Sequence, residues 1–302
     1  MTTPAIEVRS LRKAYRGTVV LDDVTFRVAP GEVFALLGPN GAGKTTTIGI
    51  LTTLLSSDGG SARIAGFDVG ERPSEVTRRI ALTGQYAAVD DVLTGRENLV
   101  MLGRLRGLPR TAARQRAAEL LERFDLTGAS DRRVATYSGG MRRRLDLALS
   151  FVTTPDVLFL DEPTTGLDTR SRRALWGVIR SLAERGVTVL LTTQYLEEAH
   201  ELADRVAVLD GGRIVAEGTP AELTARAGSV TVVLLDEAGG VRAEAPADGS
   251  LAGIRRVLAD WDTQGLSGEV AVRRPTLDDV FHRLTTASAE RELATPVRQE
   301  IA

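Results

Sequence analysis

Residues 38–45 read Gly38-Pro39-Asn40-Gly41-Ala42-Gly43-Lys44-Thr45, which matches the pattern G-x-x-x-x-G-K-[ST]. An apolar run, residues 33–37, comes directly before this stretch, and residues 48–55 continue with apolar side chains at Ile48, Ile50, Leu51, Leu54 and Leu55. A buried strand, a glycine-rich turn and a helix form the context in which the pattern indicates a phosphate-binding loop. Glycines let consecutive backbone N–H groups face an anion, and the helix N-terminus adds partial positive charge.

In such a loop Lys44 would reach the β- and γ-phosphates of a nucleotide, and the Thr45 hydroxyl would bind Mg²⁺. We expect the whole segment from Gly38 to Thr46 to contact the nucleotide. The alternative is a glycine turn that only joins a strand to a helix. Composition argues against it, because only Lys13 and Lys44 among the 38 lysine and arginine residues are lysines. A compact ammonium is preferred to a planar guanidinium at this position. The sequence therefore predicts binding of a nucleoside triphosphate.

The composition is that of an ordinary soluble globular protein, with 43% hydrophobic and 26% charged residues in a chain of 302. This length allows one large domain or two smaller ones. A net charge of −2 argues against nucleic acid as the main partner. The absence of cysteine excludes disulfides and cysteine-ligated metal sites and fits a reducing cytosol. We find neither a signal peptide nor a run of about 18 apolar residues, so we expect no membrane crossing.

The pattern of apolar runs predicts an α/β fold. Antiparallel strands are expected at residues 6–8, 19–21 and 24–28, and a short strand at 62–65. A mainly helical region should follow at 73–153. Beyond it we expect strands at 157–160 and 187–191, separated by a helix, and a hairpin at 205–217. Strands that alternate with helices imply a mostly parallel sheet.

The domain organisation follows from a change of composition near Arg226. We predict a first domain over residues 6–226, with a helical subdomain at about 87–153. A small α/β appendage at 227–286 would hold strands at 230–235 and 270–272 and helices around 251–259 and 277–284. Residues 287–302 are polar and without periodicity, and are expected to be a disordered tail.

Two carboxylates, Asp161 and Glu162, follow the apolar run of residues 157–160. In an open α/β sheet, ligands bind beyond the carboxyl ends of the strands. Asp161 is therefore placed to hold Mg²⁺, directly or through water, and Glu162 to polarise an attacking water. The alternative is a strand followed by an acidic turn, which is less favoured beside a phosphate-binding loop.

A second helix start with anion-binding character is expected at Ser138-Gly139-Gly140-Met141. Ser138 is a good N-cap, and the two glycines expose the first amides of the helix. The alternative is an ordinary capped helix. The arginines at 142–144 oppose the helix dipole, and either partner contacts or neighbouring acids could account for them. Tyr15, in the first loop, is either a half-buried aromatic or a platform for an adenine ring.

The order of these motifs resembles that of an ATP-binding subunit of an ABC transporter, over residues 6–220. The motifs are residues 38–45, Gln85, residues 138–141, Leu160-Asp161-Glu162-Pro163 and Gly166-Leu167-Asp168. The resemblance implies a P-loop NTPase cassette with a mostly parallel sheet, an antiparallel β subdomain and an inserted helical subdomain.

The resemblance also implies roles for individual residues. Tyr15 would stack on adenine, and Gln85 would sense Mg²⁺ and the membrane partner. Ser138, Gly139, Gly140 and Met141 would cap the γ-phosphate of the ATP held by the opposite subunit. Glu162 would be the catalytic base, and Asp168 would cross the dimer interface.

Within that family the chain is most similar to ATP-binding subunits of daunorubicin-type drug-resistance exporters. Three stretches carry this likeness: residues 137–145, 192–199 and 273–281. Two positions depart from the wider family, since Met141 replaces the usual glutamine and Gln194 stands where most members have a histidine that senses the γ-phosphate. We accordingly expect Gln194 to act beside Glu162 in catalysis. The two histidines, His200 and His282, read as ordinary surface or packing residues.

These features predict an ATPase whose homodimer sandwiches two ATP molecules and drives export of a drug or another hydrophobic or amphipathic compound. Export would run through a separate integral-membrane permease, with the ATPase peripheral on the cytoplasmic face of the membrane. One alternative is a soluble ABC protein acting on ribosomes or DNA, which the single phosphate-binding loop and the lack of coiled coils or zinc cysteines disfavour. Another is a weakly hydrolytic nucleotide-dependent regulator, suggested by Gln194. The permease would select the substrate.

Overall fold

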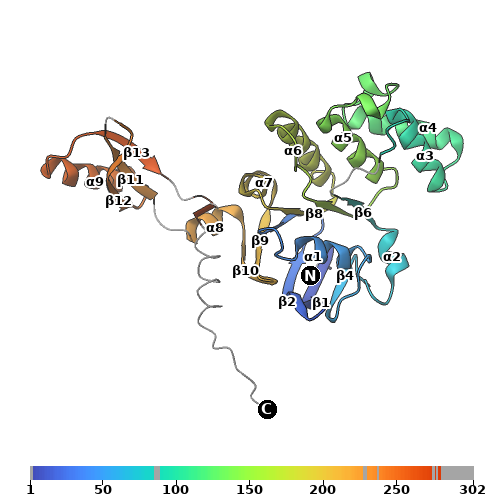
Figure 1. Cartoon of the computed structure of the whole chain (residues 1–302), viewed down its shortest axis with the longest axis horizontal. Coiled ribbons are helices and arrows are strands. Elements are labelled where there is room, and N and C mark those ends of the chain that lie inside the picture. Colours follow the sequence, from blue (N-terminus) through green and yellow to red (C-terminus); the bar gives the residue numbers. More distant parts are fainter. Residues whose placement is uncertain are drawn as a thin grey trace, which may run out of the picture. The chain divides into compact units, whose positions relative to one another are not determined.

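The computed structural model (Figure 1) describes residues 3–84, 89–226, 230–236, 238–273, 276 and 278–279. The chain divides into two compact units, Met1–Glu217 and Gly218–Ala302. The division falls before helix α8 (Pro220–Arg226), which the sequence-based boundary at residue 226 assigned to the first domain.

A six-stranded sheet forms the centre of the first unit, with strand order β10-β9-β3-β8-β7-β6. The strands are β3 (Val33–Leu37), β6 (Ile80–Thr83), β7 (Val157–Asp161), β8 (Thr188–Thr193), β9 (Arg205–Asp210) and β10 (Arg213–Gly218). The pairs β3–β8, β3–β9, β6–β7 and β7–β8 are parallel. Every residue of β3, β7 and β8 is buried, as expected for parallel strands covered on both faces. The prediction of a mostly parallel α/β sheet is confirmed.

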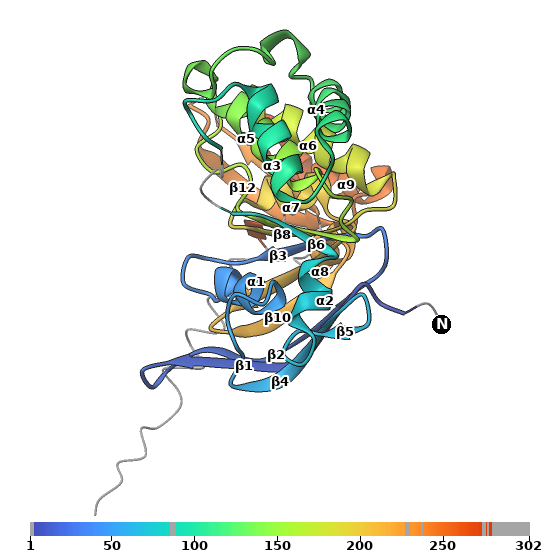
Figure 2. The same ribbon diagram turned by 90° about the vertical axis from the view of Figure 1, so that its right-hand side faces the viewer.

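A second, antiparallel sheet has the order β2-β1-β4-β5. Its strands are β1 (Ile6–Tyr15), β2 (Thr18–Val28), β4 (Gly59–Ile64) and β5 (Phe67–Asp68). Helix α1 (Lys44–Leu51) packs against β2, β4 and β7, and Figure 2 shows it between the two sheets. One core joins these layers, with the rings of Phe26 and Phe34 stacked at 5.1 Å between centroids. This core fixes the loop that precedes α1.

Along the chain, helices make up most of the stretch between β5 and β7, apart from strand β6. They are α2 (Pro73–Thr77), α3 (Gly95–Leu105), α4 (Arg110–Arg123) and α5 (Gly139–Ser150), with turns of 3-10 helix at Thr127–Ala129 and Val134–Thr136. Helices α3, α4 and α5 pack on one another. The apolar stripe of α4 is buried, as its spacing of three and four residues predicts. Helices α6 (Thr169–Ala183) and α7 (Leu196–Leu202) follow β7 and β8.

Two details of the first unit differ from the sequence-based expectation. Strand β6 lies in a region that was expected to be mainly helical. Its four residues are too few to show a strand periodicity in the sequence, and its pairing with β7 defines it as a strand. The two runs at 19–21 and 24–28 form one strand, β2, in which Asp23 has a φ of 66°. This single left-handed residue lets the strand continue through an irregular stretch of its pairing with β1.

The second unit contains α8, β11 (Val230–Leu235), β12 (Val241–Ala247), α9 (Leu251–Thr263) and β13 (Glu269–Arg273). Its antiparallel sheet has the order β12-β11-β13. Helix α9 packs on β12, and Trp261 shares a small core with Val232 and Leu234. Strand β12 was not expected, although its residues alternate between apolar and polar, because its inward residues 243, 245 and 247 are alanines of low strand propensity and Pro246 argues against a strand. The helix expected around 277–284 lies largely outside the described residues, and the tail expected at 287–302 lies wholly outside them.

The helices of the described part of the chain are too short or too polar for any of them to traverse a lipid bilayer.

Candidate functional site

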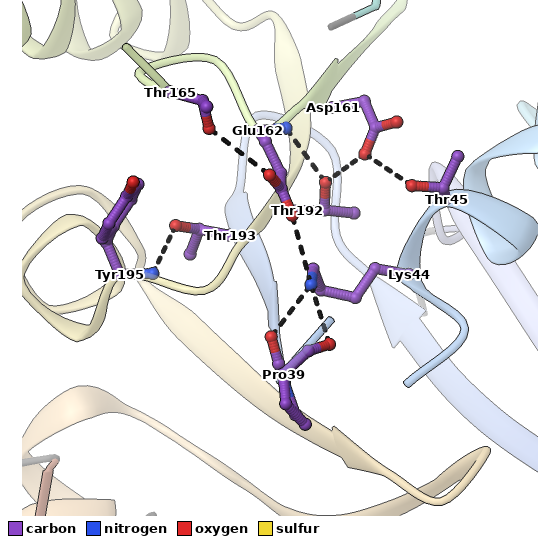
Figure 3. Close-up of polar contacts among 10 residues, drawn as sticks. Pro39, Lys44, Thr45, Asp161, Glu162, Thr165, Thr192, Thr193 and Tyr195 are labelled. Carbon is purple, nitrogen blue, oxygen red and sulfur yellow. Dashed lines mark hydrogen bonds and ion pairs between the residues drawn. The ribbon is translucent and has the colours of Figure 1, made fainter. Parts of the chain in front are cut away.

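The carboxyl ends of β3, β8 and β7 meet at one edge of the parallel sheet. In the pairing of these strands, Leu37 on β3 lies opposite Thr193 on β8, and Asp161 on β7 lies opposite Thr192 on β8. The Gly38 amide donates to the Thr193 carbonyl at 3.1 Å, which ties the loop after β3 to the end of β8. Lys44, Asp161 and Glu162 are therefore neighbours in space although about 120 residues separate them in the chain. Figure 3 shows this cluster.

The loop of residues 38–43 has the backbone that its glycines predict. Gly41 and Gly43 have φ values of 84° and 105°, in the left-handed region that side chains disfavour. A Cβ atom on Gly43 would lie 2.5 Å from Cδ2 of Leu21 on β2, so the antiparallel sheet supports the loop directly. Gly43 immediately precedes α1, and the Thr47 amide donates to its carbonyl at 2.9 Å. The loop thus leads into a helix N-terminus, where an anion is stabilised.

Lys44 is the first residue of α1, and its side chain is only 4% exposed. Its Nζ atom donates to the carbonyl oxygens of Gly38 at 2.9 Å and Pro39 at 3.0 Å. Oε1 of Glu162 lies 3.3 Å from the same nitrogen. The ammonium thus lies inside the loop, where phosphate oxygens would compete with Glu162 for it.

Asp161, the last residue of β7, is buried, and its Oδ1 atom accepts two hydroxyl hydrogen bonds. Thr192 donates at 2.6 Å and Thr45 at 3.3 Å. A carboxylate and a hydroxyl are hard oxygen donors of the kind that Mg²⁺ prefers. Within the described ranges no three His, Cys, Asp or Glu side chains form a metal-binding group. The donors present fit Mg²⁺, which is usually held by one or two protein oxygens together with phosphates and water.

Glu162 has a φ of 48°, a left-handed value that costs about 1–2 kcal/mol for a residue with a side chain. Its amide donates to both the carbonyl and the hydroxyl of Thr192, each at 3.1 Å. Its Oε2 atom accepts from the Thr165 hydroxyl at 3.3 Å. Strain of this kind persists where the surroundings determine the backbone, and it is common at functional sites. The bend brings the carboxylate to Lys44.

The second expected anion-binding helix start lies at α5. The Ser138 hydroxyl accepts from the Met141 amide at 3.3 Å, as an N-cap does. A Cβ on Gly140 would lie 2.6 Å from the Ser171 hydroxyl, so this helix start lies beside the start of α6. There Asp168 is the N-cap, and hydrogen bonds from the Ser171 amide and hydroxyl lower the pKa of its carboxyl.

The expected nucleotide-binding residues therefore fall into two groups within one chain. Among the described residues, no hydrogen bond or ion pair links 138–141 or Asp168 to the loop of residues 38–45. Lys44, Thr45, Asp161 and Glu162 form one group, and residues 138–141 with Asp168 form the other.

The remaining expected site residues are Tyr15, Gln85 and Gln194. Tyr15 is 42% exposed at the end of β1, with Nζ of Lys13 5.5 Å from the centre of its ring. Gln85 lies outside the described residues. Gln194 is half-buried and directly follows Thr193, at the carboxyl end of β8.

Sequence reasoning missed several side chains that shape this site. The Thr192 hydroxyl donates to the Asp161 carboxylate and accepts from the Glu162 amide, and the Thr165 hydroxyl donates to the Glu162 carboxylate. Two consecutive hydroxyl residues directly after the apolar residues 189–191 were the available signal for Thr192. Glu198 on α7 is also buried and accepts from Nε1 of Trp176 at 3.2 Å. Burial raises the pKa of the Glu198 carboxyl. Its place four residues after Gln194 gave no sign of this burial.

Comparison with known proteins agrees with this geometry. Residues 21–165 match the ABC transporter family. The chain is 60% identical to the daunorubicin/doxorubicin resistance ATP-binding protein DrrA of Streptomyces peucetius, over 75% of this chain and 69% of that protein. It is 48% identical to the doxorubicin resistance ATP-binding protein DrrA of Mycobacterium tuberculosis, over 95% of both chains.

Among solved structures, the ATP-binding subunit of an ABC transporter matches with a TM-score of 0.65 and 31% sequence identity. The match covers 74% of this chain and 93% of that one. The resemblance inferred from the motifs is confirmed, and neither a ribosome- or DNA-associated protein nor a weakly hydrolytic regulator is favoured. The chain therefore belongs to the ATP-binding, ATP-hydrolysing subunits of ABC transporters.

Proposed function

We propose that this chain hydrolyses ATP to drive export of a drug, or of another hydrophobic or amphipathic compound, through a separate integral-membrane permease. Drug resistance is what the names of the two DrrA relatives state of those proteins, and it supports the same class of cargo here. The observation that carries the ATPase proposal is the convergence of Lys44, Asp161 and Glu162 at one edge of the parallel sheet.

In this proposal residues 38–46 surround the phosphates of ATP, which accept hydrogen bonds from the backbone amides that follow Pro39 and from the Lys44 ammonium. Thr45 and Asp161 would hold Mg²⁺, and Gln85 would join them. When bound, the ion would neutralise charge on the β- and γ-phosphates and polarise the bond that breaks. Tyr15 would stack on the adenine ring, which its exposure at the end of β1 permits.

Glu162 would act as the general base. Its carboxylate accepts a proton from the attacking water as that water's oxygen bonds to the γ-phosphorus, while the bond to the β-phosphate oxygen breaks to give ADP and phosphate. Thr192 holds the amide of Glu162 and Thr165 its carboxylate, and phosphate oxygens that take over the Lys44 ammonium would release that carboxylate to act on water. Gln194, which follows β8, would hydrogen-bond the γ-phosphate without adding charge.

Two copies of the chain would form the working ATPase. Among the described residues, no hydrogen bond or ion pair links residues 138–141 or Asp168 to the loop of residues 38–45. A two-fold axis can bring the second group of one copy to the first group of the other. Residues 138–141 would then cap the γ-phosphate bound to the partner copy, with Asp168 near the axis. The homodimer would bind the permease at the cytoplasmic face of the membrane.

Two substitutions test this function. Glu162→Gln keeps the shape of the side chain but removes the base, so we expect ATP binding without turnover. With ATP and Mg²⁺ this variant should elute from size exclusion as a dimer. Lys44→Ala is the control that should lose nucleotide binding, because the other lysine, Lys13, pairs with Asp58 on the antiparallel sheet. Wild-type turnover by either variant would refute the assignment.

A further inference from the structure

Three consecutive arginines on α5 reach three different parts of the first unit. Nη1 of Arg142 pairs with Asp91 at 2.8 Å, and Nη1 of Arg144 pairs with Asp125 at 2.8 Å. Arg144 also donates to the carbonyls of Phe124 and Asp125. These contacts stay within the helical region. Neighbouring acids thus account for two arginines that oppose the dipole of α5.

Arg143 differs from both neighbours, since it is 8% exposed and donates to the loops that follow β6 and β7. Its Nε atom donates to the carbonyl of Pro163 at 2.8 Å. Its Nη1 atom donates to the carbonyl of Gly84 at 2.6 Å and lies 3.2 Å from Oδ2 of Asp146, one turn along α5. Pro163 follows Glu162, and Gly84 follows β6 and precedes Gln85. One guanidinium thus ties α5 to two loops that carry predicted site residues.

Stability alone does not account for this arrangement. A guanidinium stays charged in proteins, and burial lowers the pKa of Arg143 because it disfavours that charge. Asp146 compensates part of the cost, but the buried Nη2 atom has no hydrogen-bond partner among the described residues. A buried donor without a partner costs stability. An apolar side chain would fill the same space without these costs.

The contact with Pro163 acts on the most constrained backbone of the site. Glu162 is left-handed, and Thr192 fixes its amide on one side. The carbonyl of Pro163, held by Arg143, fixes the chain on the other side. The rigid fork of a guanidinium can donate to two carbonyls in a set geometry, which a lysine ammonium does not reproduce.

We propose that Arg143, oriented by Asp146, is a positioning residue for ATP hydrolysis, which ties the loop after Glu162 and the chain before Gln85 to helix α5. The helix start that would cap ATP in the partner copy then moves together with the catalytic base. This inference rests on the proposed role of Glu162.

The first test compares Arg143→Gln with Arg144→Gln in the full-length chain. Arg143→Gln should lower kcat about tenfold or more and leave KM for ATP within about twofold, since the variant misplaces the base but keeps the phosphate-binding loop. Arg144→Gln is the matched control on the same helix. It should lower the melting temperature and keep kcat within about twofold. Arg143→Lys should recover part of the lost kcat, because one of the two carbonyl contacts can re-form.

A second readout does not depend on turnover. Hydrogen–deuterium exchange of the peptide spanning residues 162–168 should speed up in Arg143→Gln and in Asp146→Asn, but not in Arg144→Gln. An unchanged exchange rate of this peptide in Arg143→Gln would contradict the proposal that Arg143 holds the loop after Glu162. Faster exchange with wild-type kcat would overturn its positioning role, as would equal losses of kcat in Arg143→Gln and Arg144→Gln. If wild-type protein has no ATPase activity, the proposed function fails. The exchange rates then still test whether Arg143 holds the loop after Glu162.

Discussion

Gln194 directly follows β8 at the carboxyl edge of the parallel sheet and is half-buried. In the proposed function its side chain faces the γ-phosphate. Its amide can donate one hydrogen bond to a phosphate oxygen and accept another. Unlike histidine it does not become cationic near neutral pH, so it offers only neutral hydrogen bonds to the developing charge. Catalysis by Glu162 with a neutral helper is compatible with turnover at a modest rate.

We therefore predict that Gln194→His is tolerated, whereas Gln194→Ala lowers kcat about tenfold or more through loss of a transition-state hydrogen bond. The competing interpretation is that Gln194 only supports the start of α7. Measuring kcat and melting temperature together on Gln194→Ala separates the two. An unchanged kcat with a lower melting temperature would exclude the γ-phosphate role.

At the scale of elements, the phosphate-binding loop and the antiparallel sheet depend on each other. Gly41 and Gly43 are both left-handed, but only Gly43 lies against β2, where a Cβ would meet Leu21. Around Gly41 there is open space. The same substitution at these two glycines therefore separates backbone strain from overpacking.

We predict that Gly41→Ala lowers the free energy of unfolding by about 1–2 kcal/mol, the cost of a left-handed residue with a side chain. Gly43→Ala should cost about 1–3 kcal/mol more, because Leu21 must also move. Urea unfolding of both variants measures the difference. Equal losses would mean that β2 does not restrain the loop.

Elements with a continuous apolar run were predictable from the sequence, and those whose identity depends on a neighbour were not. Strands β3, β7 and β8 are buried throughout and each carries a run of apolar residues. Their parallel pairing brings Asp161 to Thr45 and Glu162 to Lys44. Strand β6 is defined by pairing with β7, and β12 carries charges and a proline.

The same distinction holds for the candidate site. The glycine and lysine pattern identified the loop, but Thr192 and Arg143 act through contacts between distant parts of the chain. Arg143 donates to main-chain carbonyls, which every residue carries, so no partner residue type marks that contact in the sequence.

At the scale of the whole molecule, association with membranes should depend on the permease. When the proposed permease partner is co-expressed, we predict that the chain sediments with membranes. Expressed alone it should stay in the supernatant, because in the proposed function the permease supplies the attachment to the membrane. Co-expression with an unrelated membrane protein is the control. Sedimentation of the chain alone after a high-salt wash would contradict the prediction.

The scarcity of lysine has a practical consequence for chemical labelling. Lys13 has a side chain 12% exposed and paired with Asp58, and Lys44 lies inside the phosphate-binding loop. Amine-directed reagents that modify surfaces of most proteins therefore have few primary amines to react with here. An acylating group carried on the phosphates of ATP would be delivered to Lys44, with almost no competing lysine. Labelling of this chain would report occupancy of one site, read as the mass of a single peptide.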